Sequence, residues 1–104
     1  MISIDTPRKH LPKRKMTPQK RAEYISNACQ SGKAHKIAAS IGDALRENGM
    51  TNMSNKTGIG RAVLYRSFGE TGNPTLQILL DALKALDLRI QVVPVEDDTE
   101  EQPK

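Results

Sequence analysis

The hydrophobic positions of the chain repeat with the period of an α-helix in several short stretches. In the clearest of them, about residues 75–86, leucines recur three or four positions apart on one helical face: Leu76, Leu79, Leu80 and Leu83. Asn73-Pro74 stands just ahead and is typical of a helix start, because Asn caps helices and Pro fits the first turn. We therefore predict a helix over about 75–86.

Four more helices are predicted ahead of this one. The first runs from Pro18 to about residue 30 with Thr17 as its cap, and the second covers about 34–47. A third, short helix spans about 52–57 with Thr51 as its cap. A fourth begins at Gly60 and ends before a loop over 69–72. The turn between the third and fourth helices contains a glycine that permits a sharp reversal, Gly58.

After Asp87 the hydrophobic period changes from that of a helix to that of a strand. Apolar and polar residues alternate over Leu88-Arg-Ile-Gln-Val-Val93, and Pro94 limits further pairing. A single strand in a helical chain has no partner of its own. It therefore pairs with a second copy, pairs with another protein, or packs on the helices. We predict antiparallel pairing with a second copy through the face that carries Leu88, Ile90 and Val92.

The fourth helix has two unlike faces. Its inward face is apolar and comprises Ile59, Val63, Leu64 and Phe68. Its outward face, at the spacing i, i+1, i+4 and i+5, comprises Arg61, Ala62, Tyr65 and Arg66. In the DNA major groove, arginine can bond two acceptors on guanine, and tyrosine can meet a phosphate or a base edge. The outward face indicates a DNA-reading helix, although taken alone it equally fits an ordinary basic helix of a small all-α domain.

Charge is divided unevenly along the 104 residues, which suffice for one domain with tails. Residues 1–36 carry a net charge of +7, residues 37–95 a net charge of +1, and residues 96–104 a net charge of −4. We predict a basic flexible arm over 1–16, a folded domain over 17–95, and an acidic disordered tail over the rest. The arm is interpreted as a polyanion contact or as a merely solvated leader.

The residue inventory argues against an enzyme, a metal site or a cofactor. Cys29 and His35 are six positions apart, which is neither one helical face nor a usual zinc spacing. Asp43 and Glu47 are interpreted as a solvated pair on an exposed helix face. The single cysteine indicates a reducing compartment, and neither a signal peptide nor a membrane span is predicted. We therefore expect a cytoplasmic protein without a membrane partner.

Several motifs together resemble a family of bacterial antitoxins. They match in register over about residues 20–95: Gly49-Met50-Thr51, Lys56-Thr57-Gly58, Arg61 to Arg66, Gly72-Asn73-Pro74-Thr75-Leu76 and Leu83-Lys84-Ala85-Leu86-Asp87-Leu88-Arg89. The chain resembles the probable addiction-module antidote family, which is similar to HigA antitoxins. More broadly, it resembles the lambda-repressor-like, Xre/Cro-type helix-turn-helix fold. The fold class expected is therefore all-α, a five-helix domain of that type with a short C-terminal β-strand.

The resemblance implies an antitoxin of a type II toxin–antitoxin module, which represses its own operator and neutralises a RelE/HigB-like toxin. The partners implied are double-stranded operator DNA, that toxin and, by the symmetry of operators, a second copy of the chain. Two alternatives remain open. One is a stand-alone Xre-type regulator without a toxin partner, and the other is a toxin-binding module with little DNA affinity.

Positions along the predicted helices assign the DNA contacts. The expected base readers are Arg61, Ala62, Tyr65 and Arg66. The expected contacts to the DNA backbone, mostly at helix starts where free N–H groups favour phosphate, are Thr51, Lys56, Gly60, Asn73 and Thr75. For Lys56 a solvated surface lysine is equally consistent. The family usually has serine where this chain has Gly60, which removes a side-chain cap and a phosphate contact, and glycine where this chain has Asp87.

Overall fold

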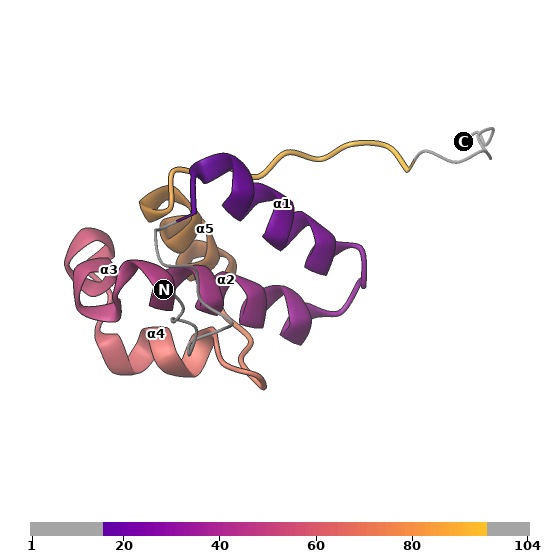
Figure 1. The fold of residues 1–104 in the computed structure, drawn as a ribbon. Coiled ribbons are helices and arrows are strands. Elements are labelled where there is room, and N and C mark those ends of the chain that lie inside the picture. Colours follow the sequence, from indigo (N-terminus) through magenta and orange to yellow (C-terminus); the bar gives the residue numbers. More distant parts are fainter. Residues whose placement is uncertain (1–15, 96–104) are drawn as a thin grey trace, which may run out of the picture.

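Over the residues that the structure describes, the chain folds into five α-helices arranged around the second of them (Figure 1). The computed structural model describes residues 16–95, and the helices are α1 (Pro18–Cys29), α2 (Ala34–Asn48), α3 (Met50–Thr57), α4 (Arg61–Ser67) and α5 (Leu76–Ala85). Over this range there is no β-strand. The all-α class predicted from the sequence is therefore confirmed.

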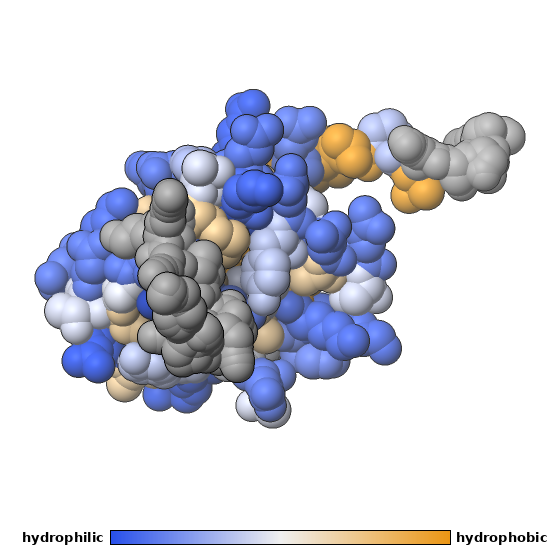
Figure 2. Space-filling model, viewed as in Figure 1, coloured by the Kyte–Doolittle hydropathy of each residue, from blue (hydrophilic) through white to orange (hydrophobic). Residues whose placement is uncertain are grey.

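The predicted arm, apart from Met16, and the predicted acidic tail lie outside the described residues. Most of the face seen in Figure 2 is hydrophilic, and hydrophobic residues gather on the C-terminal segment that leaves the body of the domain. Between residues 16 and 95, no helix has both the length and the apolar character needed to cross a membrane.

Of the three helix caps predicted from the sequence, one is present and two are wrong. Thr17 Oγ1 accepts a hydrogen bond from Lys20 N (3.2 Å) at the start of α1, as predicted. Gly60 is the residue before α4, but it has no side chain with which to cap. Thr51 lies inside the first turn of α3, because Gly49 (φ +95°) turns the chain directly from α2 into α3.

The predicted cap of α5 is displaced by two residues. Asn73 lies in the preceding loop, and the cap is Thr75, whose Oγ1 accepts from Ile78 N (3.1 Å). Threonine is itself a good cap, so the proline at position 74 precedes the helix instead of opening it.

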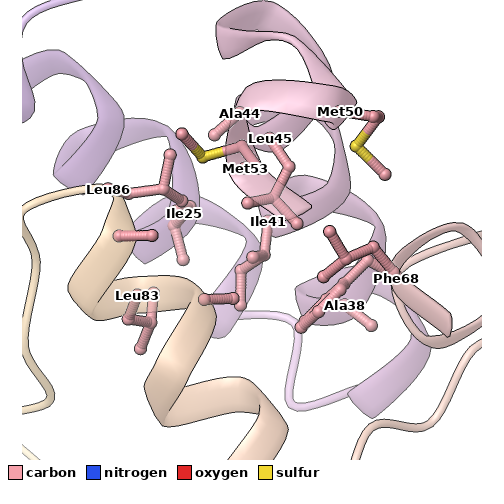
Figure 3. Packing of buried hydrophobic residues seen from close by; sticks show 13 residues of the cluster. Ile25, Ala38, Ile41, Ala44, Leu45, Met50, Met53, Phe68, Leu83 and Leu86 are labelled. Carbon is pink, nitrogen blue, oxygen red and sulfur yellow. The ribbon is translucent and has the colours of Figure 1, made fainter. Parts of the chain in front are cut away.

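The core is aliphatic except for one phenylalanine, and α2 lies at its centre (Figure 3). All four other helices pack against α2. The largest fully buried side chains come from α2 to α4 and from the ends of α4 and α5: Ile41, Leu45, Met53, Leu64, Phe68 and Leu86. Because α2 and α3 together hold α4, the position of α4 is fixed by the core.

The buried face of α5 is rotated from the one predicted. Leu83 is buried and Leu79 is half-buried, but Leu76 and Leu80 are 65% and 39% exposed. The small side chain of Ala82 faces the core instead, which lets α5 approach α2 and α3 closely. One flank of α5 therefore keeps leucines at the surface.

A buried arginine that the sequence did not single out joins three helices. Arg21 of α1 is 6% exposed. It donates to the carbonyl oxygen of Leu86 after α5 (2.9 Å) and to Asn48 Oδ1 at the end of α2 (3.4 Å). A cation next to helix C-termini is favourable because it satisfies carbonyls that lack an intrahelical donor.

Asp87 ends α5 in a left-handed conformation with φ +66°. Leu88 N donates to Leu83 O (2.8 Å) and Asp87 N donates to Lys84 O (3.0 Å), which is the hydrogen-bond pair of a Schellman motif. Residues 88–95 then continue in neither helix nor strand. The predicted strand requires a partner strand that a single copy lacks, so it stays a prediction.

Candidate nucleic-acid interface

Helix α4 is anchored by its apolar face, as predicted. Leu64 and Phe68 are fully buried, whereas Ile59 and Val63 are half-buried. Seven residues are too few for a helix that is stable by itself, so packing of this face against α2 and α3 holds α4 in place.

The opposite face of α4 is exposed at all four positions where base readers are predicted: Arg61, Ala62, Tyr65 and Arg66. The guanidinium of Arg61 lies 6.0 Å from the centre of the Tyr65 ring, at the outer limit of a cation–π contact. The structure thus brings these four side chains together on one surface, although their roles stay predictions.

The turn between α3 and α4 is fixed by two hydroxyl groups. Gly58 has φ +78°, and the backbone of Ile59 is held on both sides. Ser54 Oγ donates to Ile59 O (2.6 Å), and Thr57 Oγ1 accepts from Ile59 N (3.0 Å). These bonds set the angle at which α4 leaves α3. Hydroxyl residues near a glycine turn are the only sequence signal that could have indicated them.

Two glycines to which the sequence analysis gave no role, Gly42 and Gly72, let their own backbone lie close to the backbone at the end of α4. A Cβ atom on Gly42 of α2 would lie 2.1 Å from the carbonyl oxygen of Phe68. A Cβ atom on Gly72 would lie 2.1 Å from the carbonyl oxygen of Ser67. Real Cβ atoms do not approach so closely, so only glycine permits these contacts.

The residues predicted to contact the DNA backbone lie in α3, in the turn before α4 and in the loop before α5. Thr51, Gly60, Asn73 and Thr75 are all exposed. Lys56 is exposed as well, but its Nζ donates to Ala85 O (2.9 Å) at the end of α5, so it is not a free surface lysine. Its bond joins α3 to α5 and satisfies a terminal carbonyl.

The acidic pair on α2 is not simply solvated, which corrects the interpretation from sequence. Asp43 Oδ2 accepts from the hydroxyl of Tyr24 (2.6 Å). This hydrogen bond, together with burial and the charge of Asp43, raises the pKa of the Tyr24 hydroxyl to about 12. Glu47 accepts from Met16 N through one oxygen, while its other oxygen is buried and finds no partner among the described residues. Both carboxylates fasten α1 and its lead-in to α2.

No group of three or more potential metal ligands occurs between residues 16 and 95. Cys29 is a free thiol at the surface, and His35 is also exposed. The face of α4 is taken as the candidate nucleic-acid interface because its exposed side chains include two arginines and a tyrosine.

A family model described as "Probable addiction module antidote protein" matches residues 11–94. The chain belongs to this family. Members of the antidote family are antitoxins, so the antitoxin prediction is confirmed at the level of the family, and a toxin partner follows in general terms. The family is typically non-enzymatic. The finer assignment to the HigA-like, Xre/Cro type stays a prediction.

One relative of this antidote-family chain is an uncharacterized protein of Haemophilus influenzae. It is 33% identical over 69 residues, which cover 66% of this chain and 71% of the relative. No solved structure matches the chain.

Proposed function

We propose that this protein is the antitoxin of a type II module, which represses its own operator as a homodimer and neutralises a RelE/HigB-like toxin. The observation that carries the DNA-binding part is the outward face of α4. Four exposed residues there, two of them arginines, project from a helix whose opposite side is buried at Leu64 and Phe68.

The geometry of α3 and α4 favours a helix-turn-helix of the lambda-repressor type. Two short helices are joined by three residues, 58–60, and the second presents polar side chains outward. A major groove about 12 Å wide admits such a helix, with its first turn nearest to the base edges. Arg61 is in that first turn and reads bases in this proposal, whereas Arg66 reaches a base or a phosphate.

Backbone contacts complete the proposed interface. In this proposal the exposed residues Thr51, Gly60, Asn73 and Thr75 position the domain on phosphates. The Lys56 ammonium has three N–H donors and uses one of them on Ala85 O, so in this proposal it can donate another to a phosphate.

One α4 reads only a few base pairs, and two copies related by two-fold symmetry would read half-sites about one helical turn apart. The toxin-binding part of the proposal rests on the antidote family. The RelE/HigB type follows from the resemblance to HigA antitoxins and is the least supported part. A stand-alone regulator and a toxin-binding module with little DNA affinity are the alternatives.

A mobility-shift titration with the DNA upstream of the gene tests DNA binding. We expect a shift that random DNA of equal length does not compete away. Co-expression with the product of the neighbouring reading frame tests neutralisation, and we expect this protein to restore growth. A toxin neutralised without an operator shift would favour the toxin-binding module, and a shift without a neighbouring toxin would favour the stand-alone regulator.

A further inference from the structure

An apolar groove of about 310 Å³ opens between α1 and α5. Both helices pack on α2 but not on each other, so α2 forms the floor of the groove through Ile37 and Ile41. Ile25 and Cys29 of α1 line one wall, and Leu83 of α5 lies in the other. No residue of α3 or α4 lines it, so the groove is separate from the candidate nucleic-acid interface.

The segment that follows α5 lines this groove through residues 88–91 and then leaves it. Leu88 packs against the core, Ile90 is 46% exposed, and Val92 is 90% exposed, although the three share one side of an extended chain. Val93 and Val95 are also largely exposed. In Figure 2 this segment is the most hydrophobic part of the visible surface. Apolar side chains are thus left in water next to an apolar groove, which is unfavourable for both.

The backbone of the same segment is free to pair. Leu88 N bonds to Leu83 O, but within the described part of the chain no hydrogen bond involves the backbone of residues 89–93. An extended, unpaired run of backbone is a template for an added strand. Pro94 lacks an N–H group and ends the run.

We propose that the groove receives residues 92–95 of a second copy of this chain, while residues 88–93 of the two copies pair antiparallel. This inference rests on the homodimer of the proposed function and deepens it. Each copy supplies one segment and one groove, so a two-fold axis satisfies both grooves at once and the assembly closes at two copies.

Complementary charge favours a second copy over another partner. The loop that follows Cys29 carries Lys33, and Arg89 lines the groove itself. The sequence directly after Val95 carries a net charge of −4. Positive charge beside the groove and negative charge beside the segment occur on the same chain, so they favour contact between two copies.

Cys29 provides a direct test, because it lines the groove and is the only cysteine. One full-length chain keeps Cys29. A second chain of different tag mass carries Cys29→Ser with Val92→Cys, Val93→Cys or Val95→Cys, and the two are mixed and oxidised. A disulfide between them can form only between different copies. A matched control carries Cys29→Ser with Glu70→Cys, an exposed position in the loop after α4.

We expect at least one valine position to give roughly tenfold more mixed disulfide than Glu70→Cys, because a docked thiol has a high effective concentration. We also expect Val92→Asp to lower the mass in sedimentation to that of a monomer while its circular dichroism stays that of the wild type. If the chain is a dimer but no valine position gives more mixed disulfide than Glu70→Cys, the proposed docking of residues 92–95 in the groove is wrong. The proposal that the protein binds its operator would not be affected by that result. The proposal would also be overturned if the wild-type chain were a monomer. It would be overturned as well if the groove were occupied only by the toxin and not by a second copy.

Discussion

Asp87 occupies a left-handed position that glycine adopts without strain. We expect Asp87→Gly to raise the free energy of unfolding by about 0.5–1 kcal/mol, because the substitution relieves the Cβ clash at φ +66°. The ion pair that it removes is weak, since Arg21 Nη1 lies 4.0 Å from a carboxylate that is 68% exposed. Urea denaturation followed by circular dichroism measures the change.

Asp87→Asn is the matched control, because it removes the charge but keeps a side chain that tolerates the same backbone. Its stability should stay close to that of the wild type. A loss of stability in both variants would mean that the ion pair with Arg21 outweighs the backbone strain.

Single residues on α4 were predictable because helical spacing alone separates its two faces. Arg61 and Tyr65 lie outside, and Leu64 lies inside, as expected. Arg21 and Lys56 were not predictable in their observed roles. Their acceptors, Leu86 O and Ala85 O, are 65 and 29 positions away in sequence, and only the packed helices bring them within reach.

At the scale of elements, the contact between α2 and the end of α4 depends on Gly42. Alanine normally favours a helix interior by about 1 kcal/mol over glycine. Here we expect Gly42→Ala to destabilise the protein by about 2–4 kcal/mol, because the added methyl group would meet the carbonyl of Phe68. The melting temperature and the operator affinity should both fall.

Gly60→Ala is the control for this pair of helices. Its φ is −60°, and nothing lies within 4 Å of an added Cβ atom, so the melting temperature should hardly change. If Gly42→Ala were as stable as Gly60→Ala, the inference that α2 approaches the end of α4 too closely for a Cβ atom would be wrong.

The existence of all five helices could be predicted from their periodicity, but two boundaries and one face could not. Gly49 and Thr75 act where Thr51 and Asn73 were expected, because several capping residues compete within a few positions. In α5 the leucine repeat offered two overlapping faces, and the small Ala82 decided which one packs. The close packing of the end of α4 on Gly42 depends on distances between helices, which no local sequence pattern encodes.

At the scale of the whole molecule, the candidate nucleic-acid interface and the groove are built from different residues, so a substitution can remove contacts of one and leave those of the other in place. The basic arm is a third component and lies outside the described residues. Its five Lys/Arg between Arg8 and Lys15 should add affinity that does not depend on DNA sequence. Deleting residues 1–15 should therefore flatten the salt dependence of operator binding and leave base preference unchanged.

The control for the arm is a chain of full length whose five basic arm residues are replaced by Gln. We expect it to reduce the steepness of log K for operator binding against log salt concentration as much as the deletion does. The reduction is up to about 0.9 for each phosphate that the arm no longer neutralises. An unchanged slope in both chains would mean that the arm does not touch DNA.

The central claim is that α4 reads operator bases through Arg61. A fluorescence titration of Arg61→Ala on operator and on scrambled DNA tests it most directly, with Arg66→Ala for comparison and Lys84→Ala as control. Lys84 is exposed on α5, which does not pack against α4. We expect Arg61→Ala to lose about 1–3 kcal/mol on the operator and much less on scrambled DNA. Arg66→Ala should weaken both more evenly, Lys84→Ala should change neither, and all should melt like the wild type. Wild-type operator affinity in Arg61→Ala, or an equal loss on both DNAs, would contradict base reading by α4.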